Sequence, residues 1–322
     1  MPKVAVILAA YNSQKYLRET VDSLLRQTFT DFEVIAVNDG SKDSTGAILD
    51  DYAARDSRMR VIHKANAGQV RAAIDGIAAS TAPLIARLDA DDLCTPARLA
   101  QQVAYMDAHP DVVLLGGAYH LIDEQSRHLT TIRQPETDAA LQEILLTGRC
   151  PICQPLAMFR RDAYARTLGY RPEFSPAEDI DLWLQLGEIG KIACLPDVLL
   201  SYRQHAGSLS ESKQDVQLAN MREACRQAWE RRGVTGKYQF ENAPQWRAGS
   251  DRSSKQKQLL KYGWWAWNSG YRATARAYGW SAIKAKPQAA GGWKLLGCAL
   301  LKPLPSPGPR KPGQGWGEGR VS

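Results

Sequence analysis

The chain has 322 residues and a net charge of +7, with 44% hydrophobic and 23% charged residues. This balance is typical of a globular protein and excludes a wholly disordered chain. No apolar run of about 18 residues occurs, so the sequence predicts no membrane-spanning helix.

The chain begins with a short apolar run that meets Asn12 too early for a secretory signal. Its six cysteines follow no framework spacing, which is typical of reduced thiols. From both features we expect a soluble, cytoplasmic protein.

The positive charge is concentrated near the C-terminal end of the sequence. Residues 250–322 hold 13 Lys and Arg against two acidic residues, together with six of the nine Trp. Cationic and aromatic side chains together are typical of a surface that contacts anionic lipid or an acidic partner. Nucleic acid binding would rest on this segment alone, so no nucleic acid partner is expected.

Predicted strands and helices alternate over the first ninety residues. Short apolar runs predict strands, and apolar residues three or four positions apart predict helices. The strands are 3–9, 32–38, 60–63 and 83–88, and the helices are 13–28, with Ser13 as N-cap, 42–54 and 68–79. This order indicates a parallel sheet covered by helices on both faces.

The pattern becomes less regular beyond residue 94. Helices are predicted at 95–109, with Thr95 as N-cap and Pro96 in the first turn, and at 135–147, 178–188 and 212–232. The last of these is expected to leave the core. The predicted strands are 112–117, 119–122, 156–160, 192–195 and 199–202.

The C-terminal part of the sequence begins with a polar linker over residues 237–257. Residues 259–301 predict two or three helices rich in Ala, Trp and Gly. The tail from Pro303 is dense in Pro and Gly and is predicted to be disordered.

Polar side chains follow three of the predicted parallel strands, at 10–12, 38–45 and 89–92. Loops at the carboxyl edge of such a sheet line a ligand crevice. Three carboxylates within residues 89–92 repel one another unless a cation is near, and Mg²⁺ and Mn²⁺ prefer such oxygen ligands. The alternative interpretation is a solvated acidic loop, with Asp92 capping the following helix.

These segments resemble the family 2 glycosyltransferases of the GT-A fold. Five motifs occur in the family order, namely VIAVNDGSKDST at 34–45, NAG at 66–68, ARLDADD at 86–92, AEDIDLW at 177–183 and SYRQHAGSLS at 201–210. The resemblance implies an α/β fold with a Rossmann-like, mostly parallel central sheet. It also implies transfer of one sugar from a nucleotide diphosphate sugar, with inversion at the anomeric carbon.

We expect three parts along the chain. Residues 1–212 would form the GT-A catalytic domain, 213–302 a helical appendage of basic and aromatic character, and 303–322 a disordered tail. The appendage would either pack against the catalytic domain or a second subunit, as in a homodimer, or contact an anionic membrane.

The resemblance implies roles for four residues in donor binding. Ala10 and Tyr11 would line the nucleotide base, and Asp39 would hydrogen-bond to it. Arg71 would lie on the pyrophosphate side of the donor.

A divalent metal, Mn²⁺ or Mg²⁺, is implied by the same resemblance. Asp89 would face the ribose and the sugar, and Asp91 would hold the metal that bridges the diphosphate. His205 matches the late His that completes the metal or diphosphate site in related enzymes.

An inverting displacement needs a base for the acceptor hydroxyl. Glu178 and Asp179 match the Glu-Asp pair of the family, and Asp179 is the predicted base. Its position at a helix N-terminus should favour the ionised form and keep its pKa low. Asp181 is the alternative base, and the acidic residues of this turn also have a purely structural interpretation.

The chain departs from the family pattern at several positions. Asn38 stands where the family usually has a first Asp, and Ile74-Asp75-Gly76 stands where Arg-Asn often precedes a Gly. No Gln-x-x-Arg-Trp motif follows Trp183. Together with the lack of a predicted membrane span, this departure disfavours a processive polysaccharide synthase and favours addition of a single sugar.

The segment Cys150-Pro151-Ile152-Cys153 is an isolated C-x-x-C motif. Redox or zinc chemistry would need a thioredoxin-like context or a second pair of ligands, and the sequence shows neither. In the family this segment helps to shape the acceptor pocket.

The acceptor is expected to be a glycan or a lipid-linked oligosaccharide. Two alternatives to a glycosyltransferase stay open. A sugar nucleotidyltransferase would need a Gly-rich basic loop after the first strand, which residues 9–14 lack. A catalytically silent sugar-nucleotide or glycan-binding scaffold is disfavoured, because Asp39, Asp89, Asp91 and Asp179 are all present.

Overall fold

The computed structural model describes residues 1–205, 214–241 and 252–305, which fall into two compact units. Unit 1 comprises Met1–Ala118, Arg133–Tyr202 and Ser212–Ala243, and unit 2 comprises Tyr119–Ile132, Arg203–Glu211 and Pro244–Ser322. Most of the predicted disordered tail and part of the predicted linker lie outside the described residues. The predicted domain boundaries at residues 212 and 302 stay predictions.

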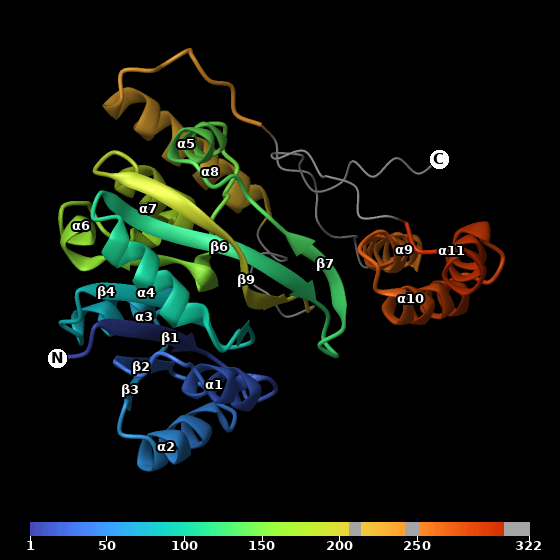
Figure 1. Ribbon diagram of the computed structural model, residues 1–322, viewed down its shortest axis with the longest axis horizontal. Coiled ribbons are helices and arrows are strands. Elements are labelled where there is room, and N and C mark those ends of the chain that lie inside the picture. Colours follow the sequence, from blue (N-terminus) through green and yellow to red (C-terminus); the bar gives the residue numbers. More distant parts are fainter. Residues whose placement is uncertain (206–213, 242–251, 306–322) are drawn as a thin grey trace. The chain divides into compact units, whose positions relative to one another are not determined.

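The sheet has the strand order β3-β2-β1-β4-β8-β6-β9-β5, with β7 paired to β6 (Figure 1). The four strands at its start are parallel, and they are β1 (Val4–Ala10), β2 (Phe32–Asp39), β3 (Met59–Lys64) and β4 (Leu84–Asp89). The later strands are β5 (Leu93–Cys94), β6 (Val112–Ile122), β7 (His128–Ile132), β8 (Met158–Arg160) and β9 (Lys191–Arg203). The pairs β4–β8, β5–β9, β6–β7 and β6–β8 are antiparallel. The predicted α/β class with a parallel central sheet is confirmed.

Two pairs of predicted strands are single strands, because β6 and β9 each continue through an apparent break. Gly116 lies inside β6, where an added Cβ would come within 3.0 Å of Cys194 Sγ and of Ile152. A glycine is therefore required here by close packing and does not mark a turn. The short strands β5 and β7 were not predicted.

Eight α-helices connect or flank the strands in the described part of unit 1. They are α1 (Leu17–Leu25), α2 (Thr45–Arg55), α3 (Gln69–Ala78), α4 (Arg98–Ala108), α5 (Asp138–Leu146), α6 (Arg161–Ala165), α7 (Glu178–Leu186) and α8 (Gln214–Arg231).

Both predicted N-caps are wrong, since α1 is capped by Tyr16 and α4 by Ala97. The hydroxyl groups of Ser13 and Thr95 donate to loop or strand carbonyls instead, those of Tyr11 and Leu199.

Of the parallel strands, β1, β2 and β4 are buried on both faces, whereas β3 lies at the edge of the sheet and is partly exposed. Ile7, Ile35 and Val37 face α3, where an added Cβ at Gly76 would lie 2.7 Å from Ile7 Cγ2. Leu8, whose side chain points to the opposite face, is also fully buried. Such strands are continuous apolar runs, which is why the sequence predicted them well.

The strand register places the ends of β1, β2, β3 and β4 along one edge of the sheet. Ala9 pairs with Asp89 of β4, and Ala10 pairs with Asn38 of β2. Asn38 in turn pairs with His63. The polar residues that follow these strands therefore share the carboxyl edge, as expected.

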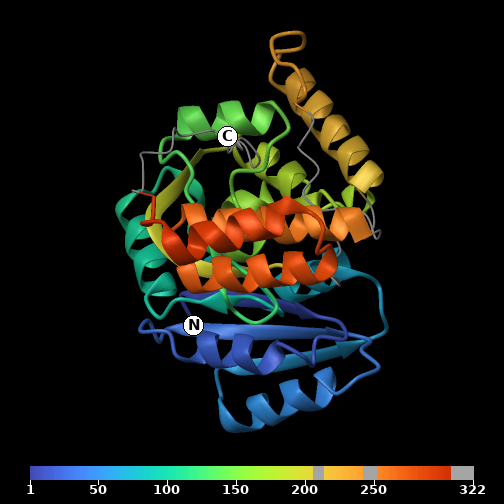
Figure 2. The same ribbon diagram turned by 90° about the vertical axis from the view of Figure 1, so that its right-hand side faces the viewer.

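Unit 2 combines the end of β6 and β7 with three C-terminal helices, α9 (Arg252–Asn268), α10 (Arg272–Ala285) and α11 (Ala290–Leu301). Figure 2 shows these helices side by side as orange and red ribbons. The prediction of two or three helices in this region is confirmed. Of the described helices, none is long and apolar enough to cross a membrane.

Polar contacts join the helices of unit 2 to the β6–β7 hairpin. Tyr278 Oη donates to the buried carboxylate of Asp123 at 2.9 Å, and the Oγ1 of Thr130 lies 2.8 Å from the Oγ of Ser269. The ring of Tyr271 stacks on that of His128, with 5.2 Å between the centroids. The hairpin and the helices therefore form one body.

Helix α8 packs against α5 and α7 in unit 1. Met221, Ala224, Cys225 and Ala228 on this helix are buried in the hydrophobic core of the unit. The expectation that this helix leaves the core is therefore wrong. Its four core residues are spaced three or four positions apart, which is the pattern of an amphipathic helix.

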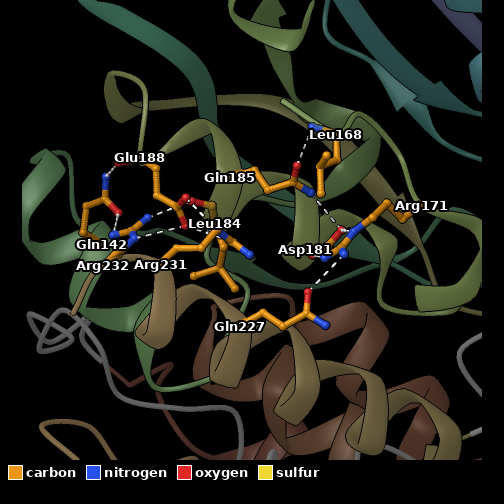
Figure 3. Close-up of polar contacts among 11 residues, drawn as sticks. Gln142, Leu168, Arg171, Asp181, Leu184, Gln185, Glu188, Gln227, Arg231 and Arg232 are labelled. Atoms are coloured by element: carbon orange, nitrogen blue, oxygen red, sulfur yellow. Dashed lines mark hydrogen bonds and ion pairs between the residues drawn. The ribbon is translucent and has the colours of Figure 1, made fainter. Parts of the chain in front are cut away.

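A polar network also ties α8 to α7 (Figure 3). Arg171 forms an ion pair with the fully buried Asp181, with 2.8 Å between Nε and Oδ2, and its Nη1 donates to Gln227 Oε1 of α8 at 3.0 Å. Gln185 Nε2 donates to Asp181 Oδ2 at 2.9 Å. Arg232, which directly follows α8, donates to the carbonyl of Leu184 at 2.7 Å.

The Arg171–Asp181 pair is expected to be essential for stability. Arg171→Ala leaves a buried carboxylate without its cation, so the free energy of unfolding should fall by about 3–5 kcal/mol. Urea denaturation of both proteins measures this difference. Arg226→Ala removes exposed ion pairs within α8 and should leave the unfolding midpoint unchanged; equal effects of the two substitutions would contradict the assignment.

Candidate active site

Hydrogen bonds join the loop after β1 to the loop after β2. The amide of Asn12 donates to Ser41 Oγ at 3.0 Å, and the amide of Lys42 donates to Asn12 Oδ1 at 2.9 Å. Asn12 has a φ of 49°, a left-handed conformation that Asn tolerates. The two loops thus form one rim, on which Tyr11 is half exposed while Ala10 is buried.

Asp39 at the end of β2 is buried and fixes the loop before α3. Its two carboxylate oxygens accept from the amides of Ala67 at 2.9 Å and Gly68 at 2.8 Å. Each oxygen has a second lone pair, so the carboxylate retains acceptor capacity for a ligand. Asn38 holds the neighbouring turn, because its Oδ1 accepts from the amide of Ser41 at 3.1 Å.

Helix α3 brings an exposed cation and an amide to the same region. Arg71 is exposed in the first turn of this helix. Gln69, two residues earlier, donates from its Nε2 to Glu178 Oε1 at 2.6 Å. Asp75, which departs from the family pattern, forms an ion pair with Lys64.

Asp89 at the end of β4 lies beside a buried guanidinium. Arg87 Nη2 is 3.7 Å from Asp89 Oδ1, and a third of the Asp89 side chain remains exposed. Loss of hydration still raises the pKa of Asp89 to about 6, and the charges of Asp91 and Asp179 act in the same direction against Arg87 and Arg98. The structure therefore brings the acidic end of β4 next to the start of α7.

Asp92 is fully buried, so a solvated loop does not describe this residue. Nor does it cap α4, which begins after Ala97. Arg98, six residues further along the chain, is also fully buried, and its Nη2 donates to the carbonyl of Arg87 at 2.7 Å. Burial raises the pKa of Tyr202 of β9 well above the usual value, and Cys153 and the charge of Asp92 act in the same direction.

Glu178 and Asp179 begin α7, as predicted. Glu178 is 3% exposed, and burial raises its pKa to about 7, with a further contribution from the charge of Asp179. Burial also raises the pKa of Asp179, although the amide of Ile180 donates to its Oδ1 at 2.8 Å and the thiol of Cys150 lies 3.5 Å from its Oδ2. The expectation of a low pKa is therefore wrong, because desolvation outweighs the helix N-terminus.

Asp181 does not share this environment. Its side chain is fully buried, and its oxygens accept from Arg171 and Gln185. These contacts favour a structural role for Asp181 and leave Asp179 as the candidate base.

Arg87 is the main site residue that the sequence interpretation missed. It is 2% exposed, its guanidinium lies 5.8 Å from the ring of Tyr170, and its Nε and Nη1 have no partner among the described residues. The available signal was a cation inside a strand, LIARLD, whose other early residues are apolar. Such a position buries the cation, and a buried cation requires nearby acids.

The carboxylates at the end of β4 offer oxygen donors of the kind that a divalent metal prefers. In the described ranges, no three His, Cys, Asp or Glu side chains are arranged to hold an ion by themselves. Mg²⁺ and Mn²⁺ are often held by one or two carboxylates plus substrate phosphates, and Asp89 and Asp91 fit that requirement. His205 belongs to unit 2, so its predicted part in the metal site stays a prediction.

The thiols of Cys150 and Cys153 lie at the same site. Burial raises the pKa of both well above the usual value, so both are protonated at neutral pH. Protonated thiols are poor metal ligands and poor nucleophiles, which disfavours metal or redox chemistry at this motif.

A parallel sheet with carboxylates along its carboxyl edge is typical of α/β enzymes that bind nucleotides there. The glycosyl transferase family 2 model matches residues 5–168, which is half of the chain. The chain belongs to this family, and it is a glycosyltransferase.

Two relatives are named for the biosynthesis of O-antigen and of amylovoran. The O-antigen biosynthesis glycosyltransferase WbnJ of Escherichia coli is 32% identical over 214 residues, which are 65% of this chain and 82% of that protein. The amylovoran biosynthesis glycosyltransferase AmsE of Erwinia amylovora is 29% identical over 240 residues, 71% and 89% of the two chains.

Solved structures of the GT-A fold are similar over nearly the whole chain. S. aureus TarS 1-349 in complex with UDP-GlcNAc matches with a TM-score of 0.59 and 18% identity, over 92% of this chain and 90% of that one. The mannosyltransferase PcManGT from Pyrobaculum calidifontis, in complex with GDP-Man and Mn²⁺, matches with a TM-score of 0.52 and 18% identity, over 93% and 80%. The predicted GT-A fold is confirmed.

The raised pKa of Glu178 predicts a measurable pH dependence of stability. The folded protein binds this proton more tightly than the unfolded chain, so the stabilisation is complete below about pH 4.5 and is lost as the pH rises to about 7. The loss amounts to about 3 kcal/mol. Glu178→Gln mimics the protonated form and should lack this loss.

Urea unfolding of wild type and Glu178→Gln at a series of pH values measures the effect as the difference between the two proteins. Glu173→Gln changes an exposed carboxyl group nearby and serves as the control. A constant difference between wild type and Glu178→Gln from pH 4.5 to 8 would contradict the burial of this proton.

Proposed function

We propose that the protein transfers a single sugar from a nucleoside diphosphate sugar to a glycan or a lipid-linked oligosaccharide, with inversion at the anomeric carbon. The observation that carries this proposal is the approach of Asp179 at the start of α7 to Asp89 at the end of β4. With Asp179 as the base, the proton acceptor would lie next to the strand end where the donor is expected. The names of the relatives and the donors bound to the similar structures support it.

The nucleotide would bind at the rim formed by the loops after β1 and β2. Ala10 and Tyr11 would contact the base, with Asp39 as hydrogen-bond acceptor, and Arg71 would approach the diphosphate. Tyr11 is half exposed and Arg71 is exposed, so both side chains are accessible to a ligand.

Asp91 would hold Mn²⁺ or Mg²⁺ beside the diphosphate, and Asp89 would face the ribose and the sugar. A bound ion of this kind neutralises negative charge on the departing nucleoside diphosphate. A cation would also offset the repulsion among Asp89, Asp91 and Asp179.

Asp179 would take the proton of the acceptor hydroxyl as its oxygen attacks the anomeric carbon. The new C–O bond forms while the bond from that carbon to the diphosphate oxygen breaks, and the proton stays on Asp179. Burial makes the carboxylate a stronger base, because it raises the pKa. The contacts of Ile180 and Cys150 with its two oxygens hold the side chain in place.

The reaction would take place at the cytoplasmic face of the plasma membrane when the acceptor is lipid-linked.

A catalytically silent scaffold is the second candidate function, and it differs in one respect: it would bind the donor without consuming it. Buried carboxyl groups with raised pKa values reduce stability, which favours the enzyme over the scaffold.

One nucleotide series is expected to stabilise the protein, and only with a divalent metal. UDP, GDP, dTDP and CMP would each be tested by thermal shift with Mn²⁺, Mg²⁺ or a chelator. A ligand at 100 times its Kd adds about 2.7 kcal/mol to the free energy of unfolding. Asp91→Ala should lose the metal-dependent part of the shift, whereas the exposed Asp111→Ala should keep it. A protein that responds to no nucleotide with any metal would overturn the donor site.

Asp179→Asn should bind the donor normally but turn it over slowly. Loss of a general base typically lowers the rate by about 10²–10⁴-fold. The assay follows release of the nucleoside diphosphate from the sugar nucleotide of the series found above, with water as the acceptor. Asp162→Asn, an exposed position in α6, is the control. If wild type and Asp179→Asn bind equally and neither releases the nucleoside diphosphate, the silent scaffold is correct.

A further inference from the structure

The C-terminal helices of unit 2 lie in a wholly cationic stretch of sequence. Residues 252–305 contain ten Lys and Arg and no Asp or Glu. A surface built from this stretch repels a second copy of itself and attracts anions.

Large apolar side chains are exposed on the same helices. Trp280 and Trp293 are each 52% exposed, Leu300 is 49% exposed, and Leu301 is 85% exposed. In unit 1, by contrast, the exposed large apolar residues belong to four separate segments. They are Met1, Tyr11, Leu168 and Val216. The concentration of such side chains on two adjacent helices therefore requires an explanation.

Glycine contacts show which sides of α10 and α11 face their neighbours. An added Cβ at Gly279 of α10 would lie 3.1 Å from Leu296 of α11, and one at Gly292 of α11 would lie 2.8 Å from Ile283 of α10. Tyr278 and Leu295 face α9, because an added Cβ at Gly263 would touch both.

The exposed residues lie on the remaining side of each helix. On α10, Arg276, Trp280 and Lys284 are four positions apart and form one exposed stripe. On α11, Trp293 follows Gly292 and Leu300 lies two turns further along. Both stripes border the α10–α11 contact on the side away from α9. We call this surface the α10–α11 face; it comprises Trp280, Lys284, Trp293, Lys294, Leu300 and Leu301.

Two arginines fix the end of α11 that carries the exposed leucines. Arg272 donates to the carbonyl of Lys302 at 2.8 Å, and Arg276 donates to that of Ala299 at 3.2 Å. These bonds satisfy carbonyls that a helix end leaves without intrahelical partners. Leu300 and Leu301 are thus presented by an ordered helix end.

We propose that the α10–α11 face docks on an anionic lipid bilayer. Tryptophan and leucine side chains enter the boundary between headgroups and acyl chains, while lysines beside them reach the phosphates. A homodimer interface is disfavoured because both copies would bring lysines and no acids. A nucleic acid would pair with the lysines but would leave Leu300 and Leu301 exposed to water. The bilayer is the partner that matches both the charge and the apolar side chains.

The test is co-sedimentation of the full-length chain with large unilamellar vesicles of phosphatidylcholine, with and without 30% phosphatidylglycerol. The wild type should bind the anionic vesicles, and raising the salt from 0.1 to 0.5 M should weaken binding, because the Debye length falls. The triple variant Trp280→Ser/Trp293→Ser/Leu301→Ser should lower the partition coefficient by at least about tenfold. All three positions are exposed, so the thermal midpoint should stay within a few degrees of wild type.

A matched control places the same change elsewhere. Leu168→Ser/Val216→Ser removes exposed apolar side chains of unit 1 and should leave vesicle binding unchanged. Equal partitioning of the triple variant and the wild type would overturn the proposal, as would a wild type that binds no vesicles. A wild-type dimer that the triple variant converts to a monomer, without vesicle binding, would identify the face as an interface between copies. Retention of the wild type on DNA but not on vesicles would assign it to nucleic acid.

Discussion

The site depends on the burial of several carboxyl groups around one guanidinium. Arg87 lies inside β4 with almost no exposed surface, and its charge acts on Asp89 of the same strand and on Glu178 of α7. Burial and mutual repulsion oppose ionisation of these acids, and the guanidinium only partly offsets this. Keeping these carboxyl groups buried and close together therefore reduces the stability of the fold. Such a cost is typical of a site that binds a cation or a proton-donating group.

Holding the acids in position requires a rigid support behind α7. The ion pair between Arg171 and Asp181 and the contact of Arg171 with Gln227 join α7 to α8, two residues beyond Asp179. Sequence alone favoured Asp179 as the base and kept Asp181 as the alternative, since both lie in the first turn of a helix. The structure separates them, because one is paired with a cation and the other borders the acidic loop.

Local patterns explain which parts of the fold were predictable. Strands β1, β2 and β4 are buried on both faces and are continuous apolar runs, and the helices between the parallel strands show regular apolar spacing. The short strands β5 and β7, the continuity of β6 through Gly116 and the caps of α1 and α4 were missed. Two of these features depend on partners far away in the sequence, since β5 pairs with β9 and Gly116 packs against Cys194 and Ile152.

At the site, too, local motifs were predictable from the sequence and the effects of packing were not. Motif order identified the acidic residues at the strand ends, but their protonation depends on burial, which no motif encodes. Asp179 shows this directly: the helix N-terminus suggested a low pKa, and desolvation by the surrounding segments raises it instead. Arg87 was overlooked because a lone cation in a strand acquires meaning only when the acids of α7 are packed beside it.

Deletion of the C-terminal helices would disturb the core of unit 2 as well as its surface. Its helices share a core with the β6–β7 hairpin, since Tyr278 donates to the buried Asp123 and Tyr271 stacks on His128. Removing residues 250–322 would leave Asp123 and His128 of the hairpin without these partners. Strand β6 of that hairpin begins in unit 1. A loss of membrane binding after such a truncation would then have two explanations. Substitutions confined to exposed side chains of α10 and α11 leave that shared core intact, so their effect reports on the surface itself.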